Sequence, residues 1–175
     1  MITFNGIDLV EHFNGDFIVN DIVGRGPMSQ ETTRISVPNR AGSYFQNRRK
    51  PERVLSVLIT LKGASLSDIR TKVDELNGIL NVAEPAPITF SDEPDKTYYG
   101  ILDGEPDWNE IVYFGQGTLT FICPDPYKYG PELEATFPSD VVALNNNGTA
   151  PSDPIFEMEV LQPVTFAMIQ NQDDE

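Results

Sequence analysis

The stretch Arg53-Val-Leu-Ser-Val-Leu-Ile-Thr-Leu-Lys62 carries the clearest secondary-structure signal in this chain. A large apolar residue recurs at every second position, and because strand side chains alternate between faces, these residues share one face. They are Leu55, Val57, Ile59 and Leu61. The opposite face carries Ser56 and Thr60. The stretch therefore predicts a β-strand that buries one of its two sides.

A helical pattern follows over residues Ser65–Asn81. Its apolar residues recur at spacings of three and four, which gives one apolar stripe along the helix. They are Leu66, Ile69, Val73, Leu76 and Leu80. Ser65, with Asp68 three residues later, resembles a capping box in which Asp replaces the usual Glu. A helix with one apolar stripe must pack on a second layer, so we expect it to lie on a sheet face.

Further strands are predicted on both sides of this pair from β-branched and aromatic residues bounded by Gly, Pro and Asp. They are Asp16–Val23, Thr32–Val37, Pro87–Phe90, Thr97–Leu102, Glu110–Phe114 and Thr118–Cys123. Gly24 and Gly26 close the first strand, where we expect a turn with positive φ. Residues 91–96 are interpreted as a turn, and Gly115-Gln116-Gly117 as a turn or a bulge. The fold class is therefore mainly β (α+β), with one packed helix at about 65–81.

The segment Asn39–Glu52 has little core-forming pattern. It contains Tyr44, Phe45 and the basic run Arg48-Arg49-Lys50. Loops of this length are uncommon in compact domains and are often functional. We interpret the segment as a long loop or a protruding hairpin arm at about 39–52, whose basic run faces nucleic acid, an acidic protein neighbour or solvent.

Charge is distributed unevenly along the 175 residues, whose net charge is −15. Residues 1–83 hold ten basic and nine acidic residues, whereas residues 84–175 hold two basic and eighteen acidic ones. Phosphate contacts require Lys and Arg, so this balance argues against a general nucleic-acid binder and against adsorption to anionic membranes. We expect no signal peptide and no membrane span, and the lone Cys123 fits a reducing cytoplasm.

Residues able to carry out catalysis or to bind a metal are few. His12 is the only histidine, and we expect it to be structural, as we expect Cys123 to be a small buried apolar residue. Asp92, Glu93 and Asp95 are clustered, but the glycine and terminal glutamate of a calcium-binding loop are missing. We therefore predict no catalytic residue, no metal and no cofactor, and a structural or binding role.

The composition changes beyond Glu134. Pro154–Val160 and Val164–Ile169 are predicted as two short strands, which cannot bury a core alone. We expect two domains, residues 1–135 and residues 136–175, the second being a linker and the incomplete start of another fold.

Several stretches resemble the distal tail proteins of siphoviruses, the siphovirus tail component family. The most specific are Ile88-Thr-Phe-Ser-Asp-Glu-Pro-Asp-Lys-Thr-Tyr-Tyr-Gly100 and Phe121-Ile-Cys-Pro-Asp-Pro-Tyr-Lys-Tyr-Gly130. Phe4-Asn-Gly6, Asp16-Phe-Ile-Val19 and the arm with Arg49 and Arg53 follow in the same order. The resemblance covers residues 1–135, and Asn147-Gly148-Thr149 is similar to the linker into the family's galectin-like second domain.

The resemblance implies a β-sandwich or split-barrel domain, a non-enzymatic role and a ring, usually a hexamer, at the end of a phage tail. Such a ring joins the tail tube to the baseplate or tip protein, and DNA passes through its channel without specific binding. The protein would be made in the bacterial cytoplasm, from a phage or a prophage genome, and located in the virion. The implied inter-subunit residues are Tyr44, Phe45, Arg48, Arg49, Lys50 and Arg53.

Two other functions compete with this one. A carbohydrate- or protein-binding accessory module of a phage or prophage particle is one, since galectin-like folds bind sugars in some settings. A carboxylate-dependent enzyme is the other, supported only by the surplus of acidic residues. In the ring interpretation, some of the acidic residues of 84–175 are expected to line the channel, and the basic arm to face a neighbouring subunit.

Overall fold

The computed structural model describes residues 1–111, 113–136, 144–159, 162, 165–166 and 168–169. The chain divides into two units, Met1–Leu133 and Glu134–Glu175. All helices and strands found among the described residues belong to the first unit.

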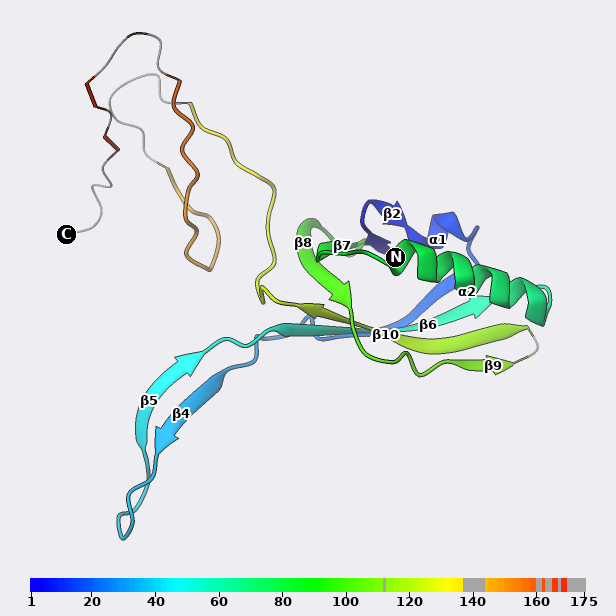
Figure 1. Ribbon diagram of the computed structural model, residues 1–175, viewed down its shortest axis with the longest axis horizontal. Helices are drawn as coiled ribbons and strands as arrows, with labels where there is room; N and C mark the ends of the chain where they lie inside the picture. The colour runs from blue at the N-terminus through cyan, green and yellow to red at the C-terminus, as the bar shows by residue number, and fades with distance from the viewer. Residues whose placement is uncertain (112, 137–143, 160–161, 163–164, 167, 170–175) are drawn as a thin grey trace. The chain divides into compact units, whose positions relative to one another are not determined.

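One eight-stranded antiparallel sheet forms the body of the first unit (Figure 1). Its strand order is β2-β1-β7-β8-β10-β6-β3. The eighth strand, β9, lies outside this order and pairs with β10. The bounds are β1 Ile2–Phe4, β2 Ile7–Asp8, β3 Phe17–Val23, β6 Arg53–Lys62, β7 Ala86–Phe90, β8 Glu93–Leu102, β9 Asn109–Ile111 and β10 Phe114–Cys123. A separate two-stranded sheet consists of β4 Glu31–Ile35 and β5 Tyr44–Arg49. The prediction of a mainly β fold is confirmed.

The sheet curls around its core. β1 and β10 are separated by β7 and β8 in the strand order, yet the rings of Phe4 and Phe121 lie 5.5 Å apart. Both rings are fully buried, and the same cluster contains the inward-facing side chains of β6 and β7. A sheet whose distant strands share one core is the arrangement expected of a β-sandwich-like fold.

Helix α2, Leu66–Leu80, covers one face of this sheet (Figure 1). The predicted strand β6 and the predicted helix are both confirmed, and Ile69, Leu76 and Leu80 are buried. Burial of each such side chain contributes roughly 1.5–3 kcal/mol to folding. The apolar stripe of α2 therefore attaches the helix to the sheet.

The start of α2 differs from a capping box in one detail. Ser65 Oγ accepts a hydrogen bond from Asp68 N at 3.2 Å, as expected, but Asp68 Oδ2 accepts from Ala64 N rather than from Ser65 N. Lys72 Nζ donates to Asp68 at 3.0 Å and to Asp16 at 2.7 Å, just before β3. The amide of Ala64 and then Lys72 lower the pKa of Asp68. The first turn of the helix is thus tied to the sheet.

Two of the predicted turns are wrong. β8 begins at Glu93, so the turn contains only Ser91 and Asp92. β10 runs unbroken through Gly115 and Gly117. The ring of Trp108 packs over both glycines, where a side chain would leave no room for it. A Cβ atom on Gly115 would come within 2.2 Å of that ring, and one on Gly117 within 2.7 Å. The glycines make room for a tryptophan instead of breaking the strand.

The first thirteen residues form elements that sequence patterns did not predict. β1 and β2 are a short hairpin, and α1 spans Leu9–His12. His12 ends this helix and its Nε2 lies 2.8 Å from Glu75 of α2. The histidine therefore contacts the second helix, in a structural position.

The second unit contains none of the predicted strands among its described residues. Pro154–Glu159 is irregular and exposed, and Val160 lies outside the described residues. Of the second predicted strand, the described residues 165–166 and 168–169 are also irregular, while 164 and 167 are not described. The interpretation of residues 136–175 as the start of a second domain stays a proposal.

Candidate functional site

The arm is a β-hairpin, β4 paired with β5, that begins earlier than the predicted 39–52. The residues predicted as an independent strand, Thr32–Val37, largely form its first strand. Every residue of both strands is exposed, so the hairpin has no buried face. Figure 1 shows it extending from the end of the sheet where β6 begins. The arm is thus a projection of the body and not part of its core.

The two faces of the arm differ in chemistry. Pairing of Thr32 with Arg48 and of Arg34 with Phe45 puts one aromatic and two basic side chains on one face. We call Arg34, Phe45 and Arg48 the basic–aromatic face; Phe45 is 66% exposed. Neither arginine has an ion-pair partner among the described residues.

On the opposite face of the arm, the basic side chain pairs with an acidic side chain of the same hairpin. Arg49 Nε donates to Glu31 Oε2 at 2.6 Å, directly across the hairpin. Thr33 with Asn47, and then Ile35 with Tyr44, are the following pairs on this face. The basic–aromatic face is therefore the one whose cations are left for another molecule.

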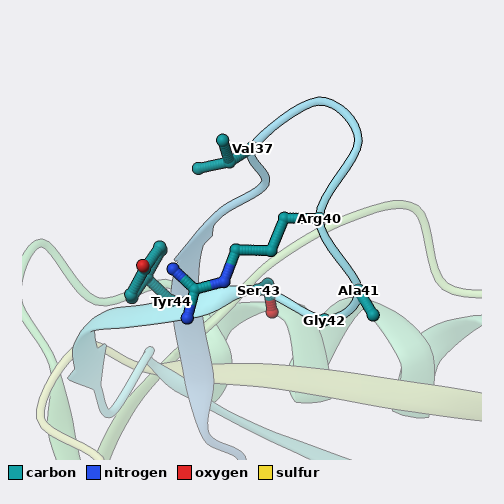
Figure 2. Close-up of a pocket in the computed structure, with 6 residues that line it drawn as sticks. All are labelled: Val37, Arg40, Ala41, Gly42, Ser43 and Tyr44. Atoms are coloured by element: carbon teal, nitrogen blue, oxygen red, sulfur yellow. The ribbon is translucent and has the colours of Figure 1, made fainter.

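The tip of the arm encloses a small hollow lined by residues of the hairpin loop (Figure 2). The lining residues are Val37, Arg40, Ala41, Gly42, Ser43 and Tyr44. Figure 2 shows the Arg40 guanidinium beside the Tyr44 ring. The guanidinium carbon lies 4.4 Å from the centre of that ring. This contact joins the loop to the first residue of β5, and all six lining residues belong to the arm.

The root of the arm is held by Arg53, the first residue of β6. Its Nε donates to Pro126 O at 2.8 Å, and its Nη1 donates to Gly24 O at 2.6 Å and Gly26 O at 3.2 Å. Nearby, Lys50 Nζ donates to Tyr127 Oη at 2.8 Å and lies over that ring. These bonds connect both ends of the arm to the segment that follows β10.

Gly24 is required at this root. Its φ is +100°, and a Cβ atom would stand 2.0 Å from Val54 O. The expected positive φ is thus confirmed for Gly24 but not for Gly26, which has open space around its Cα. The glycine lets the backbone leaving β3 pass close to the start of β6.

A second arginine holds the turn between β7 and β8 to the same loop. Arg25 donates to both carboxylate oxygens of Asp92, and its guanidinium lies 4.7 Å from the centre of the Phe90 ring. The bond from Arg25 lowers the pKa of Asp92 to about 2. Glu93 pairs with Lys128. These carboxylates are engaged by basic side chains, and the described residues contain no group of three or more metal-binding side chains.

The six residues predicted to contact a neighbouring subunit fall into two groups. Tyr44, Phe45, Arg48 and Arg49 lie on β5 of the arm, whereas Lys50 and Arg53 lie at its root. The sequence did not indicate the root partners Gly24 and Pro126, although the glycine closing β3 was a signal for the first. Cys123 is fully buried, and burial raises the pKa of its thiol to about 11.

Comparison with known proteins agrees with this architecture. Residues 8–123 match the family described as phage tail protein RIFT-related domain. The distal tail protein of Bacillus phage SPP1 is 32% identical over 152 residues, which cover 86% of this chain and 58% of that protein. The crystal structure of SPP1 Dit matches with a TM-score of 0.68 and 32% identity, over 75% of this chain and 52% of that one.

The chain therefore spans little more than half the length of these relatives. No helix in the described ranges is both long and apolar enough to cross a bilayer. The match covers the β-rich body and the arm alike, since residues 8–123 include both. On this evidence the chain belongs to the siphovirus tail protein family with the RIFT-related domain, among the distal tail proteins.

Proposed function

We propose that this chain forms a ring, a hexamer, at the end of a phage tail and joins the tail tube to the baseplate or tip protein. The observation that carries the proposal is the arm. A two-stranded hairpin is marginal in water by itself, yet here both faces are exposed and large apolar side chains remain uncovered. Such an element is typical of a surface completed by a partner.

A closed ring requires a heterologous contact, in which a patch on one subunit meets a different patch on the next. A projecting arm supplies one of these patches. The SPP1 relative is described as a paradigm of the hub adsorption apparatus in phages that infect Gram-positive bacteria, which supports the same place in the virion for this chain. We propose residues 1–135 as the ring-forming domain and residues 136–175 as the start of a second one.

The proposed partners are further copies of this chain, the tail tube protein and the tail tip protein. The protein would be made in the bacterial cytoplasm, from a phage or prophage genome. The acidic surplus of residues 84–175 would keep DNA that passes through the ring from binding to its wall. The proposed role is structural and needs no catalytic group or cofactor.

Light scattering coupled to size-exclusion chromatography tests the proposal over a range of protein and salt concentrations. We expect a species of about six subunits that dissociates as salt rises, because salt screens contacts between exposed charges. A protein that is monomeric at every concentration, or that forms only symmetric dimers, would contradict the ring.

A further inference from the structure

The sequence contains four Asn-Gly dipeptides, Asn5-Gly6, Asn14-Gly15, Asn77-Gly78 and Asn147-Gly148. An asparagine followed by glycine is especially prone to spontaneous deamidation, because glycine has no side chain to hinder attack by its backbone nitrogen on the asparagine amide. All four asparagines are exposed to solvent, so access of water does not distinguish them. The backbone conformation of each pair does distinguish them.

Deamidation requires a particular backbone geometry. The glycine nitrogen bonds to Cγ of the asparagine, the bond from Cγ to the side-chain nitrogen breaks, and that nitrogen leaves as ammonia with the proton that the backbone nitrogen has lost. The product is a cyclic succinimide, which water opens at either carbonyl to an aspartyl or an isoaspartyl residue. The ring closes only after rotation about the Cα–C bond of the asparagine has turned the next nitrogen toward the side chain. A backbone held in the right-handed or left-handed helical region does not have this geometry.

Three of the pairs are held in these helical regions by the fold of the first unit. Asn5-Gly6 and Asn14-Gly15 have positive φ at both residues, +48° and +80° in the first pair and +52° and +85° in the second. In the second pair the attacking atom is also engaged, since Gly15 N donates to Val10 O at 2.8 Å. Asn77-Gly78 lies inside α2, where amides donate to carbonyls four residues earlier. Each of these pairs must break local structure before a ring can close.

The fourth pair, Asn147-Gly148, lies in the second unit and has none of these restraints. It belongs to no helix or strand, and Asn147 is not among the residues with positive φ. Gly148 N donates to the exposed side chain of Asn146 at 2.7 Å, and the side-chain amide of Asn147 has no hydrogen-bond partner in the described part of the chain. A single exposed hydrogen bond adds little to stability, because water readily replaces it. The backbone at Asn147 can therefore rotate at small cost.

We propose that Asn147 is a site of spontaneous deamidation, at which a succinimide forms and water opens it. Water is the co-reactant, ammonia is the product released, and the reaction needs no enzyme. Each event adds one carboxylate to a chain whose net charge is already −15, and the isoaspartyl form adds one carbon atom to the backbone. The neighbouring Asn145 and Asn146 are each followed by asparagine, whose side chain hinders the same attack. The reaction is independent of the proposed ring, because the site lies outside residues 1–135.

Mass spectrometry of the whole protein, incubated folded at neutral pH and then digested, tests this reaction. Lys128 is the last basic residue, so trypsin releases residues 129–175 as one peptide, separate from the peptides 1–25 and 73–96 that hold the other pairs. We expect OH to replace NH2 at Asn147, as a mixture of aspartyl and isoaspartyl forms, while the other two peptides keep their amides. A sample digested without incubation corrects for loss during handling. Retention of the amide at Asn147, or equal loss from all the pairs, would overturn the proposal.

Two comparisons separate the effect of the fold from that of the sequence. In denaturing guanidinium chloride all the Asn-Gly pairs should lose ammonia at similar rates; if three of them stay slow, their sequence and not the fold protects them, and the selection of Asn147 by structure is wrong. Gly148→Ala in the folded protein should slow the loss at Asn147 about tenfold, which corresponds to a barrier about 1.4 kcal/mol higher. Gly78→Ala, the matched control in α2, should leave that rate unchanged. An unchanged rate in Gly148→Ala would contradict attack by the Gly148 nitrogen, and circular dichroism establishes that both variants are folded.

Discussion

Replacing Arg53 by Met should loosen the root of the arm and lower the stability of the first unit. Met retains the apolar stem but removes the guanidinium that donates to three backbone carbonyls. Two of these bonds are partly buried, at 2.8 and 2.6 Å, and hydrogen bonds from charged groups contribute about 1.5–3 kcal/mol each. Because water reaches part of the site and replaces some of the lost bonding, we expect a total loss of roughly 2–3 kcal/mol.

The measurement is equilibrium unfolding in urea, with thermal unfolding as a second readout. The expected loss corresponds to a fall in Tm of about 10 °C for a unit of this size. Arg49→Met is the matched control. The ion pair of Arg49 with Glu31 is exposed, with 74% and 52% of the two side chains accessible, so its loss should cost about 0–1 kcal/mol. Equal effects of the two substitutions would refute the distinction between root and arm surface.

Three further substitutions test other features of the body. Gly24→Ala should destabilise the protein by about 2 kcal/mol or more, through a positive φ and a clash with the backbone, while Gly26→Ala should change stability little; chemical denaturation compares them. Tyr98→Phe should leave stability unchanged or raise it by about 1 kcal/mol, because the buried Tyr98 hydroxyl has no hydrogen-bond partner in the described part of the chain. Asp92→Asn should flatten the acid side of the stability profile: since Arg25 lowers the pKa of Asp92 from 3.8 to about 2, its contribution is present above about pH 4 and lost as pH falls toward 2.

Controls for the last two substitutions come from neighbouring residues. Tyr129→Phe removes a hydroxyl that donates to Asp125 and should destabilise the protein, unlike Tyr98→Phe. A marked loss of stability in Tyr98→Phe would show that its hydroxyl is bonded after all. Asp95→Asn removes an exposed carboxylate without an ion-pair partner among the described residues, so its profile should keep the wild-type acid limb. An unchanged limb in Asp92→Asn would contradict the importance of the Arg25 pair.

Burial of one face is what made the body predictable from the sequence. The period-two pattern of Arg53–Lys62 and the stripe of the helix both follow from packing against the core, and both elements were located to within a residue. The arm strand Tyr44–Arg49 has no such pattern, because neither of its faces is buried. Its pairing with β4 depends on a partner strand that the alternation of residues cannot identify.

Contacts between distant residues account for most of the other differences. Gly115 and Gly117 were predicted as a turn or a bulge from the glycines alone. The sequence pattern could not show that the ring of Trp108, from outside the strand, packs over them. Arg53 belonged by position to a basic arm, but its partners come from segments far away in sequence. The lack of a core-forming pattern located the arm, and only the folded chain separates its outward-facing arginines from Arg53, which holds its root.

The bond between Arg53 and Pro126 also has a consequence for the timing of synthesis. Pro126 lies 73 residues after Arg53, so a chain still growing on the ribosome has its arm long before it has this anchor. Domains generally fold as units once their residues are available. The root is complete only when the whole first unit has been made. A nascent chain that has not yet reached Pro126 therefore has an arm whose root lacks this bond and keeps only the bonds from Arg53 to Gly24 and Gly26.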